Sequence, residues 1–202
     1  MYSKITGASP DDLLKQAGTV ANGLVLYYVS VLLLLLAIAG ALLRGRSLPS
    51  NFCRRRYGWL YPLLVVGVAA LIFTTNLSVI RADIVYKHAK SYYEAGQWDA
   101  SIALYQQAVK LVPHEDYYYL FLGSAYLEKT KDVSDPAERS ALLEESRKVL
   151  ERALQLNPLN TDHSANLARL YRTWGQMASD SAQRADKLGK ALEYYRQATN
   201  LS

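Results

Sequence analysis

Two long apolar runs fill most of the first 80 residues, and the rest of the chain mixes apolar and polar positions at helical spacing. Residues 17–43 and residues 57–80 contain no charged side chain and no histidine. Each run is longer than the about 20 apolar residues that a helix needs to cross a bilayer. Ionisable groups inside a span usually mark a proton or ion pathway, so their absence argues against transport. We therefore predict two transmembrane helices, at 17–43 and 57–80, after an N-terminal segment, 1–16.

Residues 81–202 contain three similar segments, and each segment has the pattern of two successive helices. The first helix of each unit carries a small residue and, three positions later, an aromatic one: Ala89 and Tyr92, Gly123 and Tyr126, Ala168 and Tyr171. The second helix carries an alanine three positions before a leucine: Ala108 and Leu111, Ala153 and Leu156, Ala198 and Leu201. Small side chains let antiparallel helices approach closely, and bulky ones fill the gap to the next unit. The pattern predicts an all-α fold with three stacked helical hairpins.

The three units differ in length. The small residue of the first helix precedes the alanine of the second by 19 residues in the first unit and by 30 in the other two. The difference equals about three helical turns, so we predict lengthened helices and a longer connection around Lys129–Asp135. Asp135 and Pro136 have the sequence of a helix start. No Gly or Pro lies between Gly67 and Gly96, which predicts one nearly continuous helix over 63–94, with a break, if any, at 74–76.

These residues resemble the tetratricopeptide repeat over 81–202, about 60% of the chain. The match includes the small and aromatic pair, the turn glycines Gly96 and Gly175, the alanine of the second helix, and the closing prolines Pro113 and Pro158. The resemblance implies an α-solenoid whose first helices line a concave groove that binds a protein partner. The third unit reaches Ser202 without its proline or a polar capping helix, so we expect either a truncated sequence or another protein on its last face.

The resemblance also indicates which side chains face the groove. They form an aromatic wall flanked by basic groups: Tyr86, Lys87, Lys90, Tyr93, Tyr117, Phe121, Ser124, Asn166, Arg169 and Arg172. Such a surface can hold an extended peptide, a partner helix or a glycan. The asparagine and lysine pattern with which related repeats clamp a C-terminal carboxylate is incomplete here. The alternative is that tyrosines such as Tyr92, Tyr93, Tyr118 and Tyr119 only pack the core.

The net charge of +5 lies entirely in the loop 44–56, because the segments 1–16 and 81–202 are each neutral. The loop carries Arg44, Arg46, Arg54, Arg55 and Arg56. Short basic loops stay in the cytoplasm, so we predict a two-pass protein of the plasma or inner membrane with both termini on the extracytoplasmic side. The arginines also suit contact with anionic lipids of the bilayer. A nucleic-acid partner is not indicated, because the repeats carry no net basic charge.

The chain contains no recognisable catalytic set. The single Cys53 excludes an intrachain disulfide framework and a thiolate metal site. His88, His114 and His163 lack metal-ligand spacing, and neither a phosphate-binding glycine loop nor a serine-nucleophile elbow is present. We therefore predict a protein that is not an enzyme and that holds no cofactor and no metal.

The sequence leaves three functions open. The first is a membrane-anchored scaffold that mediates protein–protein interaction on the extracytoplasmic face. The second is an accessory subunit of a larger membrane complex, energy-converting or photosynthetic. The third follows from a resemblance, in architecture and over 74–128, to the C-terminal tail of bacterial O-antigen ligase or polymerase-type membrane proteins. Because the upstream spans and the large arginine-bearing outer loop of that family are missing, the chain would then be a non-catalytic part of a glycan ligase or polymerase.

Overall fold

The computed structural model describes residues 10–43 and 60–202, and these residues form seven α-helices. The helices are α1 (Pro10–Leu43), α2 (Leu60–Glu94), α3 (Trp98–Leu111), α4 (Asp116–Lys129), α5 (Pro136–Leu156), α6 (Thr161–Met177) and α7 (Ser181–Leu201). The described residues contain no strand, so the all-α prediction is confirmed for this part of the chain.

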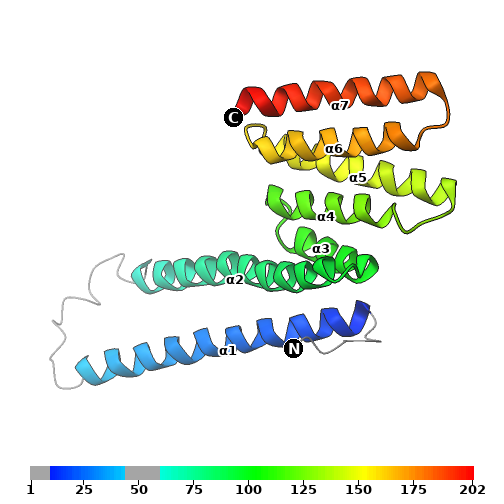
Figure 1. Cartoon of the computed structure of the whole chain (residues 1–202). Coiled ribbons are helices and arrows are strands. Elements are labelled where there is room, and N and C mark those ends of the chain that lie inside the picture. Colours follow the sequence, from blue (N-terminus) through cyan, green and yellow to red (C-terminus); the bar gives the residue numbers. More distant parts are fainter. Residues whose placement is uncertain (1–9, 44–59) are drawn as a thin grey trace.

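The helices form a stack that begins with the long pair α1 and α2 and ends with α7 (Figure 1). The most extensive contacts join α2 to α3, α4 to α5, and α6 to α7, so these pairs are the three helical hairpins. The hairpins are linked where α3 packs on α4 and α5 packs on α6. α1 lies along α2 and also contacts α3. First and second helices of the predicted units therefore alternate along the stack, from α2 and α3 through α4 and α5 to α6 and α7.

Two buried clusters hold the units together. One joins α2, α3 and α4 and includes Tyr105 and Tyr118. The other runs from α4 to α7 and includes Leu150, Leu167 and Ala191. Each cluster extends across a junction between units, and burying one large apolar side chain contributes about 1.5–3 kcal/mol. The stack is therefore stabilised by contacts between neighbouring units as well as within them.

Two helical glycines allow close packing. A Cβ atom at Gly123 would lie 2.5 Å from Cγ of Leu150, and one at Gly175 would lie 2.9 Å from Cγ of Leu188. The prediction that Gly175 is a turn glycine is wrong, because α6 continues beyond it and the missing side chain admits Leu188 of α7. Gly96 is a turn glycine, with a φ of +72° that L-residues rarely adopt.

The predicted helix lengths agree with the structure. α2 is continuous over 35 residues, without a break at 74–76. α5 and α7 each contain 21 residues, against 14 in α3. The carboxylate of Asp135 accepts hydrogen bonds from the backbone N–H groups of Ala137 and Glu138, with Pro136 at the first helical position. The extra residues of the second unit therefore lengthen its second helix, as the spacing predicted.

The membrane helices remain predictions. Among the residues that the structure describes, no helix meets the length and hydropathy that a membrane span requires. The loop arginines Arg44, Arg46, Arg54, Arg55 and Arg56 lie outside the described residues, as does Cys53. The segment boundaries at 17–43, 44–56 and 57–80 are therefore neither confirmed nor contradicted.

Candidate protein-interaction surface

The first helices of the three units, the end of α2, α4 and α6, are neighbours in the stack. Tyr86 of α2 contacts aromatic rings of α4, and Ser124 of α4 is hydrogen-bonded to two side chains of α6. We call the surface that these three helices share the inner face. All ten side chains predicted to line a groove belong to these helices.

The aromatic part of the inner face lies between α2 and α4. The ring of Tyr117 is 4.7 Å from that of Phe121 and 5.3 Å from that of Tyr86 between centroids. Tyr117 is 41% exposed and Phe121 is half-buried, so both present an apolar edge at the surface. Tyr86 is only 7% exposed. The prediction that Tyr86 lines the groove is therefore wrong, because its ring packs into the first core cluster against Tyr105, Tyr118 and Phe121.

The structure agrees with the alternative that Tyr92, Tyr93, Tyr118 and Tyr119 are packing residues. Tyr118 is buried, and Tyr92 and Tyr93 pack partly buried against the same cluster. The hydroxyl of Tyr119 donates a hydrogen bond to the backbone oxygen of Pro113. Burial raises the pKa of Tyr118 to about 12, so this phenol is neutral at physiological pH. These side chains stabilise the unit and leave little aromatic surface for a ligand.

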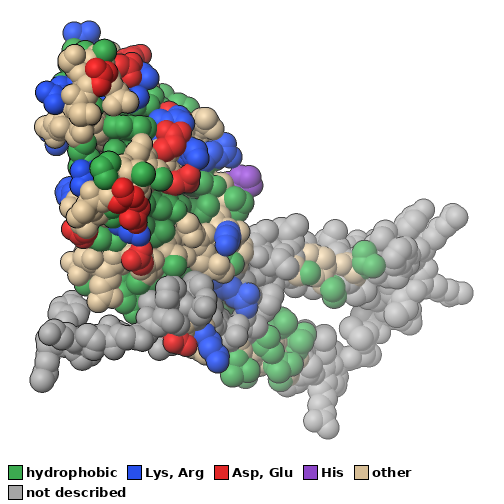
Figure 2. All heavy atoms as spheres, turned by 90° about the vertical axis from the view of Figure 1, so that its right-hand side faces the viewer, with side chains coloured by type: hydrophobic (Ala, Val, Ile, Leu, Met, Phe, Trp, Pro, Cys, Tyr) green, Lys and Arg blue, Asp and Glu red, His purple; other side chains and the backbone are tan. Residues whose placement is uncertain are grey.

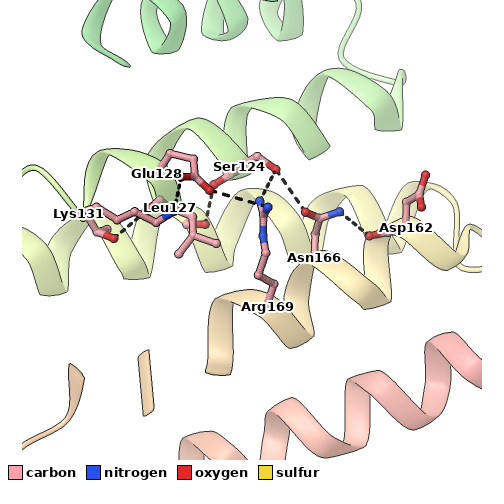
Figure 3. Close-up of polar contacts among 10 residues, drawn as sticks. Ser124, Leu127, Glu128, Lys131, Asp162, Asn166 and Arg169 are labelled. Atoms are coloured by element: carbon pink, nitrogen blue, oxygen red, sulfur yellow. Dashed lines mark hydrogen bonds and ion pairs between the residues drawn. The ribbon is translucent and has the colours of Figure 1, made fainter. Parts of the chain in front are cut away.

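A polar network occupies the inner face between α4 and α6 (Figure 3). Nη2 of Arg169 donates a hydrogen bond of 3.3 Å to Oγ of Ser124, which in turn donates to Oδ1 of Asn166 at 3.4 Å. Nη1 of Arg169 lies 3.8 Å from a carboxylate oxygen of Glu128. Glu128 is also paired with Lys131. The predicted residues Ser124, Asn166 and Arg169 are therefore brought together, with Ser124 buried beneath the other two.

Arg169 keeps donor capacity for a ligand. Its side chain is 37% exposed, and its contact with Glu128 is longer than a hydrogen bond. Its Nε atom is buried and has no hydrogen-bond partner among the described residues, so the donors that a ligand would meet are on the terminal nitrogens Nη1 and Nη2. A guanidinium offers five N–H donors in a planar fork that suits a carboxylate or a peptide carbonyl. Arg169 is the strongest candidate on the inner face for direct contact with a partner.

The charges of this network also act on Tyr93 of α2. Burial and the charge of Glu128 raise the pKa of Tyr93, whereas Arg169 lowers it. Tyr93 of α2 is therefore close enough to Glu128 of α4 and Arg169 of α6 for their charges to change its pKa. Sequence reasoning missed Glu128 and Lys131, although Glu128 stands four residues after Ser124 and therefore on the same side of α4.

The basic flanks of the predicted groove carry less free charge than the sequence indicated. Nζ of Lys87 lies 2.7 Å from a carboxylate oxygen of Asp83, and Nζ of Lys90 lies 3.9 Å from one of Glu94. All four side chains are largely exposed, so each pair is worth at most about 1 kcal/mol and can open to meet a partner. Arg172 is exposed on α6. The inner face thus mixes both signs of charge.

The comparisons with known proteins agree with this architecture. Residues 86–135 match the model of the family described as tetratricopeptide repeat. They run from α2 through α3 and α4 to the cap of α5, which is one hairpin and the first helix of the next. These residues are therefore similar to tetratricopeptide repeats. The chain is also 28% identical over 95 residues to "Interferon-induced protein with tetratricopeptide repeats 2" of Cricetulus griseus. This stretch covers 44% of the chain and 20% of the relative, so the chain spans about a fifth of that protein.

Proposed function

We propose that this protein is a membrane-anchored scaffold whose tetratricopeptide repeats bind a protein partner through the inner face. The repeats themselves indicate a role in protein–protein interaction. The observation that carries the proposal is the network of Arg169, Asn166, Ser124 and Glu128, which connects two neighbouring first helices at the surface. The guanidinium of Arg169 and the carboxylate of Glu128 are a donor and an acceptor of the kinds that pair with the C=O and N–H groups of a peptide backbone.

The aromatic edge of Tyr117 and Phe121 lies on the same face and favours an apolar side chain next to that backbone. A protein segment with both features fits better than a glycan, because the rings of Tyr117 and Phe121 meet edge to face and do not form a flat surface on which a sugar ring could stack. The binding mode is an extended segment that crosses α4 and α6.

A membrane anchor is supported by α1. Ten large apolar side chains between residues 26 and 38 are at least 39% exposed, and they spread over more than three turns: Leu26, Tyr27, Tyr28, Val29, Leu32, Leu33, Leu34, Leu35, Leu36 and Ile38. At 100° per residue these positions cover the whole circumference of the helix. Leu63 and Val66 of α2 are exposed as well. In Figure 2 apolar side chains gather over α1, whereas the repeats above it carry mixed charges.

Exposure of such an apolar surface to water is unfavourable, whereas its transfer into the hydrocarbon core of a bilayer is favourable. The uncharged runs 17–43 and 57–80 supply the required length. The basic loop 44–56 orients the pair with the repeats on the extracytoplasmic side.

The binding proposal is tested with Arg169→Gln in the full chain, purified in mild detergent together with its bound proteins. Arg152→Gln is the matched control, because Arg152 is an exposed arginine on α5, away from the inner face. We expect a set of proteins identified by mass spectrometry to be retained by the wild type and by R152Q and to be reduced at least tenfold with R169Q, while helical circular dichroism is unchanged.

Equal recovery from all three samples would contradict a role for the inner face. The same experiment tests the accessory-subunit alternative, and the upstream reading frame tests the other. A fixed stoichiometric set of membrane subunits that survives R169Q would favour the accessory subunit, whose contacts would lie elsewhere. Many further spans encoded upstream in the same reading frame would favour the tail of a glycan ligase or polymerase.

A further inference from the structure

The last helix of the stack carries an apolar stripe on an outward side. Leu188, Leu192 and Tyr195 of α7 are 40%, 52% and 37% exposed. Their spacing of four and three residues places them on one side of the helix. In Figure 1 α7 closes the stack at the end opposite to α1 and α2. We call these three side chains the α7 stripe.

The repeat register shows what such positions do in the earlier units. When the second helices are aligned on Ala108, Ala153 and Ala198, Tyr195 corresponds to Tyr105 of α3 and to Leu150 of α5. Both of these side chains are completely buried.

At the other two positions of the stripe, one of the two equivalent residues is a buried apolar side chain. Leu192 corresponds to Ile102 of α3, which is 8% exposed, and to the charged Arg147 of α5. Leu188 corresponds to Leu143 of α5, which is 2% exposed, and to the partly buried Trp98 of α3.

In the earlier units the next first helix contributes to this burial. Tyr105 belongs to the same cluster as Tyr118 and Leu122 of α4. Leu150 belongs to the same cluster as Leu167 and Leu170 of α6. The α7 stripe therefore has the register of a surface on which a helix packs, and its apolar area continues the α6 and α7 core through Leu188, which lies against Gly175.

The charges beside the stripe indicate which helix fits. Arg184 stands four residues before Leu188, and Arg196 stands four residues after Leu192, so a basic residue lies at each end of the stripe. A second copy of the chain would bring arginine against arginine, whether its α7 ran parallel or antiparallel. A helix with acidic residues at both ends of its apolar side would form opposite-charge pairs instead.

We propose that the α7 stripe docks an amphipathic helix of a partner protein that carries an acidic residue at each end of its apolar side. The site is separate from the inner face and extends the stack by one helix. It does not depend on the ligand of Arg169.

The test uses the full chain in detergent and three synthetic peptides. The first is a helical peptide with leucines along one side and glutamates at both ends of that side. The second replaces those glutamates with lysines, and the third has the first composition in an order that is not amphipathic. Binding is measured by fluorescence anisotropy at low salt. Leu192→Glu is compared with Leu159→Glu, because Leu159 is also an exposed leucine but lies between α5 and α6.

We expect the acidic amphipathic peptide to bind at least tenfold more tightly than the other two. L192E should weaken its binding at least tenfold, L159E should leave it unchanged, and Arg196→Glu should shift the preference toward the lysine peptide. Light scattering in the same detergent follows the oligomeric state. Equal binding of the acidic and basic peptides, or binding that L192E does not change, would overturn the proposal. So would a dimer of this chain that L192E dissociates, because the occupant would then be a second copy.

Discussion

At the scale of single residues, a contact between a buried histidine and a carboxylate joins the second and third units. His163 of α6 is completely buried, and its Nε2 lies 2.5 Å from Oδ2 of Asp116 at the start of α4. Burial would raise the pKa of Asp116, but hydrogen bonds with His163 and Asn157 outweigh it, so the pKa is held below its ordinary value. The carboxylate is thus favoured in its charged form when the repeats are folded.

Because the folded state depresses this pKa, the stabilisation by Asp116 is fully present above the unfolded value of about 4 and is lost as the pH falls through the lower folded value. We expect Asp116→Asn to lower the free energy of unfolding at pH 7 by about 1–3 kcal/mol. The difference from the wild type should shrink below about pH 4. Urea unfolding of the full chain, followed by circular dichroism at several pH values, measures both.

Asp162→Asn is the control, because Asp162 is an exposed carboxylate next to His163 in the first turn of α6. Its effect should be small at every pH. Parallel pH profiles for the wild type and D116N would show that Asp116 does not carry the pH dependence.

At the scale of the elements, the spacing of small residues determines how closely helices pack. The pattern of small and aromatic residues was sufficient to predict the helical pairs, the long α2 and the lengthened α5. It could not separate a turn glycine from a packing glycine, since both appear as a small residue near a helix end, and Gly175 was therefore assigned wrongly. It also placed Tyr86 on the surface, because the side on which a tyrosine packs depends on neighbours from another helix.

The packing role of Gly123 gives a direct prediction. A Cβ at this position would lie 2.7 Å from Cδ2 and 2.5 Å from Cγ of Leu150, which is completely buried. We expect Gly123→Ala to destabilise the protein by about 1–3 kcal/mol through overpacking, despite the better helix propensity of alanine. Thermal or urea unfolding measures the change.

Gly189→Ala is its matched control, because Gly189 is also helical but nothing lies within 4 Å of its Cβ position. There the substitution should stabilise by about 0.5–1 kcal/mol. If G123A were as stable as G189A, α4 and α5 would have room to separate at this point.

At the scale of the whole molecule, the sequence predicted the repeat architecture well, whereas the binding of a partner by the inner face stays a prediction. Ser124, Asn166 and Arg169 could be placed on one face from the sequence, because the repeat pattern indicates which side of each first helix faces the groove. Glu128 and the pairing of Lys87 with Asp83 were missed, because the rotamers of the side chains determine which charged groups pair. The membrane helices and their orientation stay predictions, since the charged loop lies outside the described residues.

The orientation can be tested on intact cells or spheroplasts. Protease added outside should digest the repeats, 81–202, and leave the loop 44–56 protected, because the five arginines keep that loop in the cytoplasm. Immunoblotting with tags placed in each segment follows both. Digestion of the repeats only after lysis would reverse the topology.

The continuity of α2 has a mechanical consequence. One uninterrupted helix of 35 residues begins in an apolar segment and ends as the first helix of the first repeat, so no joint separates the two parts. Such a helix is about 50 Å long, and a tilt of about 10° at its base would displace its far end by roughly 9 Å. A force on the N-terminal half of α2 is therefore transmitted to Tyr93 and its neighbours, and the repeats tilt together with α2.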